Sequence, residues 1–247
     1  MPEFKFEGAS LHYEEEGEGE PLLLLHGNGE ELHYFDKQIP VFAQQYRVIA
    51  MDTRAHGEST RGEGDLSFEH FADDAAALLE YLGIESAHVL GFSDGGNTAM
   101  MLALRHPRKV RSLLLNGANA DPAGVKGQWR LLTVMGYWLL LLFAQFSETA
   151  AYKRDIIRLM VKQPRLTSVN LGAIDAPTLV LVGQNDMIKP EHSQMITRNI
   201  RHAQLVTLRG AGHFAAQSHS EEYNKIALEF FSKAKQGTTV QIMTSED

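Results

Sequence analysis

The chain has 247 residues and a net charge of −8, with 44% hydrophobic and 22% charged residues. This length and composition are typical of a globular protein with one large domain. The chain has no cysteine, which excludes disulfides, cysteine-ligated zinc and a thiol nucleophile. The negative charge and the lack of a long basic run argue against a nucleic-acid partner. The N-terminus lacks an apolar signal segment, so we predict a cytoplasmic protein.

Strands are predicted from the chain's short apolar and β-branched runs. Residues 4–17, FKFEGASLHYEEEG, are expected to form an antiparallel hairpin at a sheet edge. Six further strands follow, and all but the last are nearly continuous apolar runs, as in parallel strands buried on both faces. These six strands are predicted at 21–26, 46–52, 87–92, 110–117, 177–183 and 203–208.

Amphipathic segments between these runs predict helices. The clearest one, at 67–83, places Phe68, Phe71 and Leu78 on one face and ends at a glycine. The other helices are predicted at 96–107, 190–200 and 220–234. Alternation of strands and helices predicts an α/β fold, with a mostly parallel twisted sheet and helices on both faces.

Residues 119–170 contain no convincing strand, and we interpret them as a helical cap inserted after the sixth strand, 110–117, counting the two strands of the hairpin. Residues 1–118 and 171–247 would then form the core. The uncharged stretch 131–144 is shorter than the roughly 20 residues that a spanning helix needs, so no membrane span is predicted. Residues 236–247 are expected to be a frayed tail or a short appended segment.

The stretch VLGFSDGGNTA, residues 89–99, places Ser93 between Gly91 and Gly95 where a predicted strand passes into a helix. Glycines on both sides let the helix approach the strand closely, and the sharp turn presents the serine hydroxyl to solvent. This pattern favours a nucleophilic serine over an ordinary turn residue.

Two more candidate residues follow later strands: Asp186 after 177–183, and His213 after 203–208. The carboxyl ends of parallel strands meet at one edge of a sheet, where open α/β folds place their ligands. A serine hydroxyl needs a histidine to accept its proton, and that histidine needs a carboxylate to orient it. The sequence therefore predicts a catalytic triad of Ser93, Asp186 and His213.

The oxyanion hole is predicted to use the backbone N–H of Asp94 and a donor from Asn28 in HGNGE, residues 26–30. The side chain of Asp94 has two interpretations: a favourable acid in the first helical turn, or an acceptor for a substrate ammonium group. His26 and His33 are seven residues apart, which does not match the spacing of a helical metal site. No metal and no cofactor are predicted.

Five segments occur in the order HGNGE, DTRAHGES, GFSDGG, PTLVLVGQND and GAGH. In this order the chain resembles α/β-hydrolase-fold serine hydrolases, and the resemblance covers most of the chain. The SDGG elbow is similar to that of the biphenyl-hydrolase-like, valacyclovir-hydrolase-type esterases. The resemblance implies Ser93 as nucleophile, Asp186 as orienting acid, His213 as base, and the Asn28 and Asp94 amides as oxyanion donors. Ala55 stands where this family usually has glycine.

The predicted function is hydrolysis of carboxylic esters of small to medium apolar substrates through an acyl-enzyme. Trp129, Leu132 and Trp138 in the cap are expected to bind substrate as an apolar wall. The same triad supports thioester, lactone, amide or carbon–carbon bond hydrolysis, or perhydrolysis, and the fold does not separate these. A non-catalytic ligand receptor, a membrane-associated lipase and a homodimer are left open.

Overall fold

The computed structural model of the chain describes residues 3–235. Eight strands form one sheet in the order β1-β2-β4-β3-β5-β6-β7-β8. The strands are β1 (Glu3–Phe6), β2 (Ala9–Glu16), β3 (Glu20–Leu25), β4 (Tyr46–Met51), β5 (Ala87–Phe92), β6 (Val110–Asn116), β7 (Thr178–Gly183) and β8 (Ala203–Leu208). β1 and β2 pair antiparallel at one edge, β2 joins β4 antiparallel, and the other pairs are parallel.

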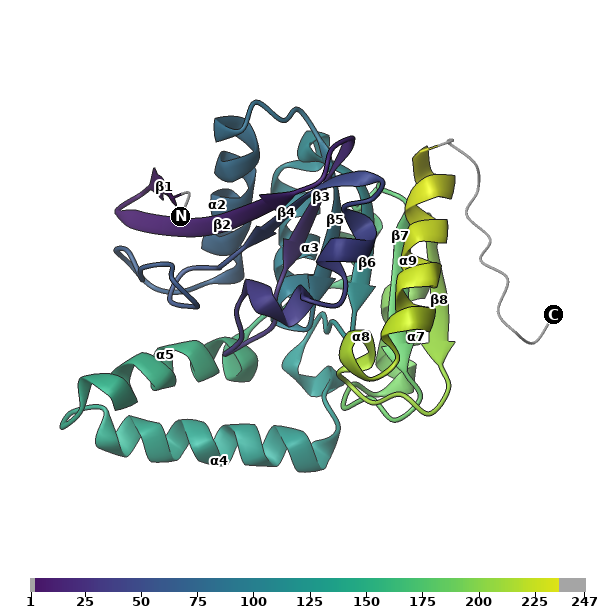
Figure 1. Ribbon diagram of the computed structural model, residues 1–247. Helices are drawn as coiled ribbons and strands as arrows, with labels where there is room; N and C mark the ends of the chain where they lie inside the picture. Colours follow the sequence, from purple (N-terminus) through teal and green to yellow (C-terminus); the bar gives the residue numbers. More distant parts are fainter. Residues whose placement is uncertain (1–2, 236–247) are drawn as a thin grey trace.

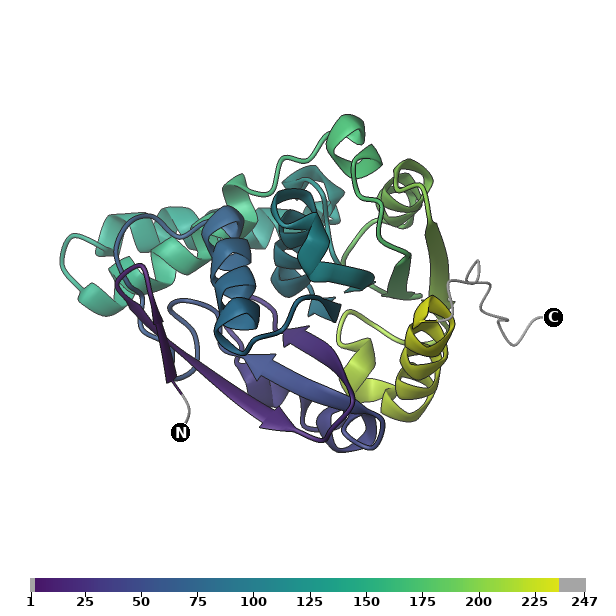
Figure 2. The same cartoon turned by 90° about the horizontal axis from the view of Figure 1, so that it is seen from above.

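Helices cover both faces of this sheet (Figures 1 and 2). The helical elements are η1 (Leu32–Phe35), α1 (Ile39–Phe42), α2 (Phe68–Tyr81), α3 (Asp94–Arg105), η2 (Pro107–Lys109), η3 (Pro122–Gly124), α4 (Gly127–Phe143), α5 (Glu148–Lys162), α6 (Ser168–Gly172), α7 (Pro190–Asn199), α8 (Ala215–Ser218) and α9 (Ser220–Lys235). This arrangement confirms the predicted α/β class, the parallel sheet and the helical insertion after the sixth strand.

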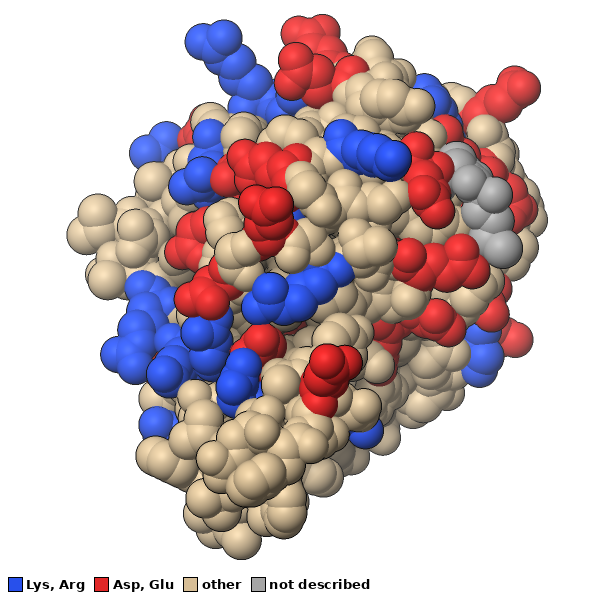
Figure 3. Space-filling model, turned by 90° about the vertical axis from the view of Figure 1, so that its left-hand side faces the viewer, with Lys and Arg blue, Asp and Glu red and all other residues tan. Residues whose placement is uncertain are grey.

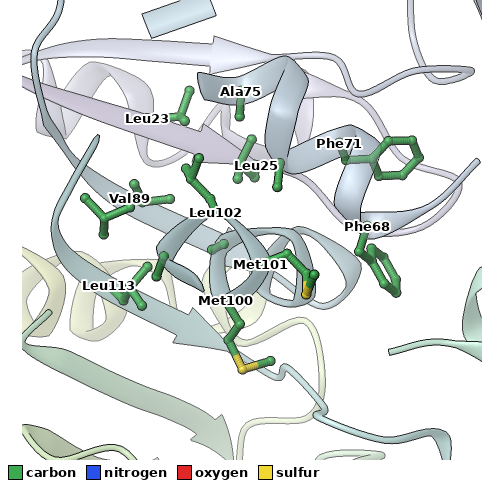
Figure 4. Packing of buried hydrophobic residues seen from close by; sticks show 14 of the residues in the cluster. Leu23, Leu25, Phe68, Phe71, Ala75, Val89, Met100, Met101, Leu102 and Leu113 are labelled. Carbon is green, nitrogen blue, oxygen red and sulfur yellow. The ribbon is translucent and has the colours of Figure 1, made fainter. Parts of the chain in front are cut away.

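Two buried clusters lie on opposite faces of the sheet and fix its strands in place. On one face, α2 and α3 pack over the central strands, with Leu102 close to Leu25 and Val89 (Figure 4). On the other face, Phe42 of α1 and Phe231 of α9 cover β3 and β4. Because strands β3 to β7 are buried on both sides, their sequences are apolar without alternation.

The insertion between β6 and β7 contains α4 and α5, which form an antiparallel pair beside the core (Figure 1). α5 lies between α4 and the sheet, and its Ile156 and Leu159 belong to the core cluster. The domain boundaries predicted at 118/119 and 170/171 stay a prediction. No helix within residues 3–235 is both long and apolar enough to cross a membrane.

The predicted elements agree with the structure to within two residues, and the start of α3 is the difference that matters. The helical segment was predicted at 96–107, with Asp94 already placed at the start of the helix as an oxyanion donor. It begins at Asp94, directly after Ser93. The N–H of Asp94 is therefore the first of the helix. The tail expected at 236–247 lies outside the described residues.

Candidate active site

Ser93 occupies the turn between β5 and α3 with φ 53° and ψ −117°, in a backbone region that L-residues rarely adopt. Its backbone N–H donates to the carbonyl oxygen of Asn116 on the neighbouring strand, which holds the turn against β6. A side chain at Gly95 would collide with the carbonyl oxygen of Leu25, and one at Gly91 with that of Gly95. The two glycines therefore permit the close approach of strand and helix that keeps the turn strained.

The structure brings the three predicted triad side chains together. Nε2 of His213 lies 3.0 Å from Oγ of Ser93, and its Nδ1 lies 2.7 Å from Oδ1 of Asp186. Asp186 Oδ1 also accepts the backbone N–H of Ile188 at 3.0 Å. Asp186 and His213 are buried, whereas Ser93 is half-buried. These distances join a hydroxyl, an imidazole and a carboxylate in one chain of hydrogen bonds.

The side chain of Asp94 joins the HGNGE turn to the start of α3, the two segments that were predicted to supply oxyanion donors. Its Oδ2 accepts from Nδ2 of Asn28 at 2.8 Å, and its Oδ1 accepts from Nδ2 of Asn97 at 3.2 Å. Nδ2 of Asn28 also donates to the carbonyl oxygen of Ile156. Because both side-chain hydrogens of Asn28 are engaged, its predicted oxyanion role is left to its backbone N–H. Burial raises the pKa of Asp94 to about 6, so the carboxylate is mostly charged at neutral pH.

The HGNGE turn is held by a buried neutral histidine. Nδ1 of His26 lies 2.8 Å from the carbonyl oxygen of Gly27, and its Nε2 accepts the N–H of Thr53. Burial lowers the pKa of His26 to about 3. Asp52 accepts the N–H of Leu32 and that of Glu58, so DTRAHGES braces the same turn. Ala55 adopts φ 62°, the left-handed conformation for which glycine is the usual residue.

A cavity opens beside Ser93. Its polar end is formed by Ser93, Asp94 and Asn119, and the rest of its wall is mainly apolar. From the insertion and the loop after β7 it is lined by Arg130, Thr133, Val134, Met160, Met187 and Ile188.

The three residues predicted to bind substrate lie elsewhere. Trp129, Leu132 and Trp138 are 43%, 59% and 60% exposed, and none of them lines this cavity. Of α4, the structure places Arg130, Thr133 and Val134 along the cavity instead. Trp129 and Trp138 are one helical turn from Thr133 and Val134, at the edges of that inward face, and Leu132 is on the outward side. Among the described residues, no group of three or more His, Asp or Glu could hold a metal ion.

Comparisons with known proteins show which proteins the chain resembles. Residues 20–137 match the alpha/beta hydrolase fold family. The 2-hydroxymuconate semialdehyde hydrolase of Pseudomonas putida is 29% identical over 260 residues, which cover 92% of each chain. The chain has the α/β-hydrolase fold.

Two further relatives of this hydrolase also match over most of its length. The human serine hydrolase BPHL is 27% identical, over 90% of this chain and 83% of its own. The solved structure of a thermophilic esterase from Thermogutta terrifontis superimposes with a TM-score of 0.78 at 25% identity. That match covers 95% of this chain and 99% of the esterase.

Gly117, which was not singled out from the sequence, makes room for the His213–Asp186 pair. It has φ 60°, and a Cβ there would lie 2.9 Å from Nδ1 and Cε1 of His213. The Asn-Gly pair at the end of a predicted strand is the signal that could have identified it. The close contact means that any side chain at this position would displace the imidazole.

We expect Gly117→Ala to lower kcat/KM of the hydrolase about 100-fold, because small displacements of a catalytic group have effects of that order. The control is Gly83→Ala, since Gly83 has φ 68° and nothing within 4 Å of a built Cβ. Both variants place an alanine in a left-handed backbone conformation, which costs about 1–2 kcal/mol of folding free energy. Steady-state kinetics and urea unfolding separate the two effects. Equal kcat/KM in the two variants would contradict the spacing role of Gly117.

Glu30 is a second residue that the sequence reasoning missed. It ends the HGNGE turn near His213, and its Oε2 is buried without a hydrogen-bond partner among the described residues. Burial raises the pKa of Glu30 from 4.5 to about 7, and the opposing influence of His213 is smaller. A carboxyl group whose pKa is higher in the folded state favours folding when it is protonated.

The hydrolase should therefore lose stability as pH rises between the unfolded and folded pKa values of Glu30, 4.5 and about 7. In that window the folded state binds a proton that the unfolded state has released. We expect Glu30→Gln to remove this loss, so the variant gains stability relative to wild type from about pH 5 to about pH 8. Urea unfolding at both pH values measures the change. Glu31→Gln is the control, because Glu31 is exposed. If Glu30→Gln and wild type show the same change in unfolding free energy between the two pH values, the prediction is refuted.

Proposed function

We propose that this hydrolase cleaves carboxylic esters of small to medium apolar substrates through a covalent acyl-enzyme. The observation that supports this most directly is the chain of hydrogen bonds from Ser93 through His213 to Asp186, beside a mainly apolar cavity. A hollow with a few polar groups at one end and a mainly apolar wall is typical of small-molecule sites.

The geometry supports a defined role for each triad member. Nδ1–H of His213 donates to Asp186, which leaves Nε2 unprotonated and able to accept the proton of Ser93. Oγ of Ser93 then attacks the ester carbonyl, and the protonated imidazole is stabilised by the buried carboxylate. His213 returns the proton to the leaving alkoxide, which completes formation of the acyl-enzyme.

The second half of the reaction uses the same groups. Water takes the place of the leaving alcohol, His213 accepts its proton, and the resulting hydroxide attacks the acyl carbonyl. The bond from the acyl carbon to Oγ of Ser93 then breaks, and His213 returns the proton to Oγ as the carboxylic acid leaves. In both halves the carbonyl oxygen becomes negative. The backbone N–H groups of Asp94 and Asn28 are the proposed donors to it, and the first of them also lies at the positive end of the α3 dipole.

The polar end of the cavity supports a second candidate, hydrolysis of a carbon–carbon bond in a substrate that carries a carboxylate. Arg130 lines the cavity and supplies a cation, and Asn119 adds an amide. The relative from Pseudomonas putida is named for a muconate semialdehyde, a compound with a carboxylate group. Both oxygens of Asp94 accept hydrogen bonds from asparagines, which supports a structural role for this side chain over capture of an ammonium group.

A substrate panel tests the proposal. We expect turnover of p-nitrophenyl esters with a preference for short and medium acyl chains, and retention of that ester activity in Arg130→Gln. Turnover of a semialdehyde dienoate that exceeds ester turnover, and that is lost in Arg130→Gln, would replace the ester assignment by the carbon–carbon one. An aminoacyl ester in the same panel tests the role of Asp94. A folded protein that cleaves none of these compounds would refute the proposal.

A further inference from the structure

The outward face of α4 is a surface that hydrolysis leaves unexplained. Six large apolar side chains on it are each 57–64% exposed: Leu131, Leu132, Met135, Trp138, Leu139 and Leu142. At 100° per residue these six positions fall within an arc of about 120° on the helix. We call this set the α4 apolar face, and Phe143 and Phe146 extend it at the C-terminal end of the helix. Continuous exposed apolar surface of this kind marks an interaction site.

This face is uncharged along its whole length. The nearest charged residues are Arg130 before it and Glu148 after it. The two tryptophans of the chain, Trp129 and Trp138, are both on α4, and both are exposed. Tryptophan concentrates where an apolar environment meets water, as at the surface of a bilayer. A helix with one buried face and one apolar exposed face is suited to lie in the plane of that surface.

The insertion that carries this face has a net positive charge, although the chain as a whole is negative. Residues 119–170 contain seven Lys and Arg against three Asp and Glu, whereas the whole chain has a net charge of −8. Four of the seven are on α5: Lys153, Arg154, Arg158 and Lys162. Figure 3 shows Lys and Arg, with Asp and Glu among them, above an uncharged protrusion at the bottom of that view, where α4 and α5 meet. Basic residues beside an apolar helix match the negative surface of a membrane with anionic lipids.

We propose that the α4 apolar face inserts into the surface of an anionic membrane, with the basic residues of α5 contacting the lipid headgroups. A second copy of the chain fits this surface less well, because it would bring two positively charged insertions together. Anionic lipid satisfies both features at once, the apolar face and its basic surroundings.

This placement has a consequence for the cavity, and that consequence rests on the proposed function. Thr133 and Val134 on the inward face of α4 line the cavity beside Ser93. The lipid surface would therefore lie about one helix diameter, roughly 10 Å, from the cavity wall. Apolar esters that partition into the membrane would reach the site over a short distance.

Vesicle flotation tests the binding itself and is independent of hydrolysis when the Ser93→Ala protein is used. We expect this protein to float with vesicles of phosphatidylglycerol and phosphatidylcholine in equal parts, and to float weakly with phosphatidylcholine alone. A shift of tryptophan emission to shorter wavelength should accompany binding, since both tryptophans are on α4. Ester hydrolysis can fail without affecting this result, so the two proposals are tested separately.

Substitutions locate the surface. Trp138→Glu combined with Leu142→Glu should reduce the lipid partition coefficient at least about tenfold. Val169→Glu, which alters an 80% exposed apolar residue on α6, should leave the lipid partition coefficient unchanged.

Lys153→Glu should reduce partition into the anionic vesicles about 20- to 30-fold, because each basic charge near the surface contributes about fivefold and the substitution changes the charge by two. Lys225→Glu, on the exposed surface of α9, is the matched charge control.

Three results would overturn the proposal. One is a folded protein that floats with neither vesicle, and another is flotation that persists in the Trp138→Glu, Leu142→Glu variant. The third is a wild-type protein that does not bind vesicles but sediments as a dimer in analytical ultracentrifugation, while the Trp138→Glu, Leu142→Glu variant sediments as a monomer. That result would assign the α4 apolar face to a second copy of the chain.

Discussion

Replacement of Ser93 by alanine is expected to lower kcat/KM for ester hydrolysis by about 10⁴- to 10⁶-fold, with little change in stability. The loss is large because the hydroxyl is the proposed nucleophile, and without it no group of the triad can form the covalent bond with the substrate. A residual rate of about 10³-fold over water is expected from the oxyanion donors and binding alone. Steady-state kinetics on a p-nitrophenyl ester measures the change.

A covalent probe separates a lost nucleophile from a damaged fold. A fluorophosphonate should label wild type and the control Ser232→Ala, whose serine is exposed on α9, and should not label Ser93→Ala. Circular dichroism and urea unfolding should be the same for all three proteins. Labelling that persists in Ser93→Ala would place the reactive serine elsewhere, and the proposed mechanism would then be wrong.

The fold was predictable from the sequence because its strands are buried on both faces. Such strands are continuous apolar runs, and their alternation with amphipathic helices leaves few alternatives to a parallel sheet. The approach of Ser93, Asp186 and His213 was predictable for the same reason, since the carboxyl ends of parallel strands share an edge. Their catalytic roles, and the oxyanion roles of Asn28 and Asp94, stay a prediction.

The inward face of α4 was not predictable, because this helix is apolar on nearly all sides. A periodic pattern assigns a buried face only where apolar and polar residues alternate with the helical period. In α4 the exposed Trp138 is as apolar as the inward Val134, so the sequence favoured the aromatic side chains as the wall. Gly117 and Glu30 were missed for a different reason. Their importance depends on the position of His213, which is distant in sequence.

The largest expected loss of stability comes from a buried ion pair away from the site. Nε and Nη2 of Arg54 donate to the two carboxylate oxygens of Asp74 at 2.6 and 2.8 Å, and both side chains are nearly inaccessible to solvent. The guanidinium also donates to the carbonyl oxygens of Phe6 and Glu7, so it joins the N-terminal hairpin to α2. Burial raises the pKa of Asp74, and the hydrogen bonds from Arg54 oppose that rise.

Asp74→Asn is expected to lower the free energy of unfolding by about 3–5 kcal/mol, because it removes the buried counter-charge of the guanidinium. The remaining carboxylate, that of Glu7, is exposed and lies 4.0 Å from Nη2. Urea unfolding measures the loss. The neighbouring Asp73 is the matched control, since it pairs with the partly exposed Arg105, and Asp73→Asn should cost at most about 1 kcal/mol.

The double replacement Arg54→Met, Asp74→Leu identifies the cause of this loss. If the uncompensated charge is responsible, removing both charges should restore most of the stability that Asp74→Asn loses, because apolar pairs often replace buried ion pairs without cost. If instead the hydrogen bonds from Arg54 to Phe6 and Glu7 hold the hairpin, the double variant should be at least as unstable as Asp74→Asn. In that case the pair stabilises the fold by joining β1 to α2, and the electrostatic explanation would be wrong.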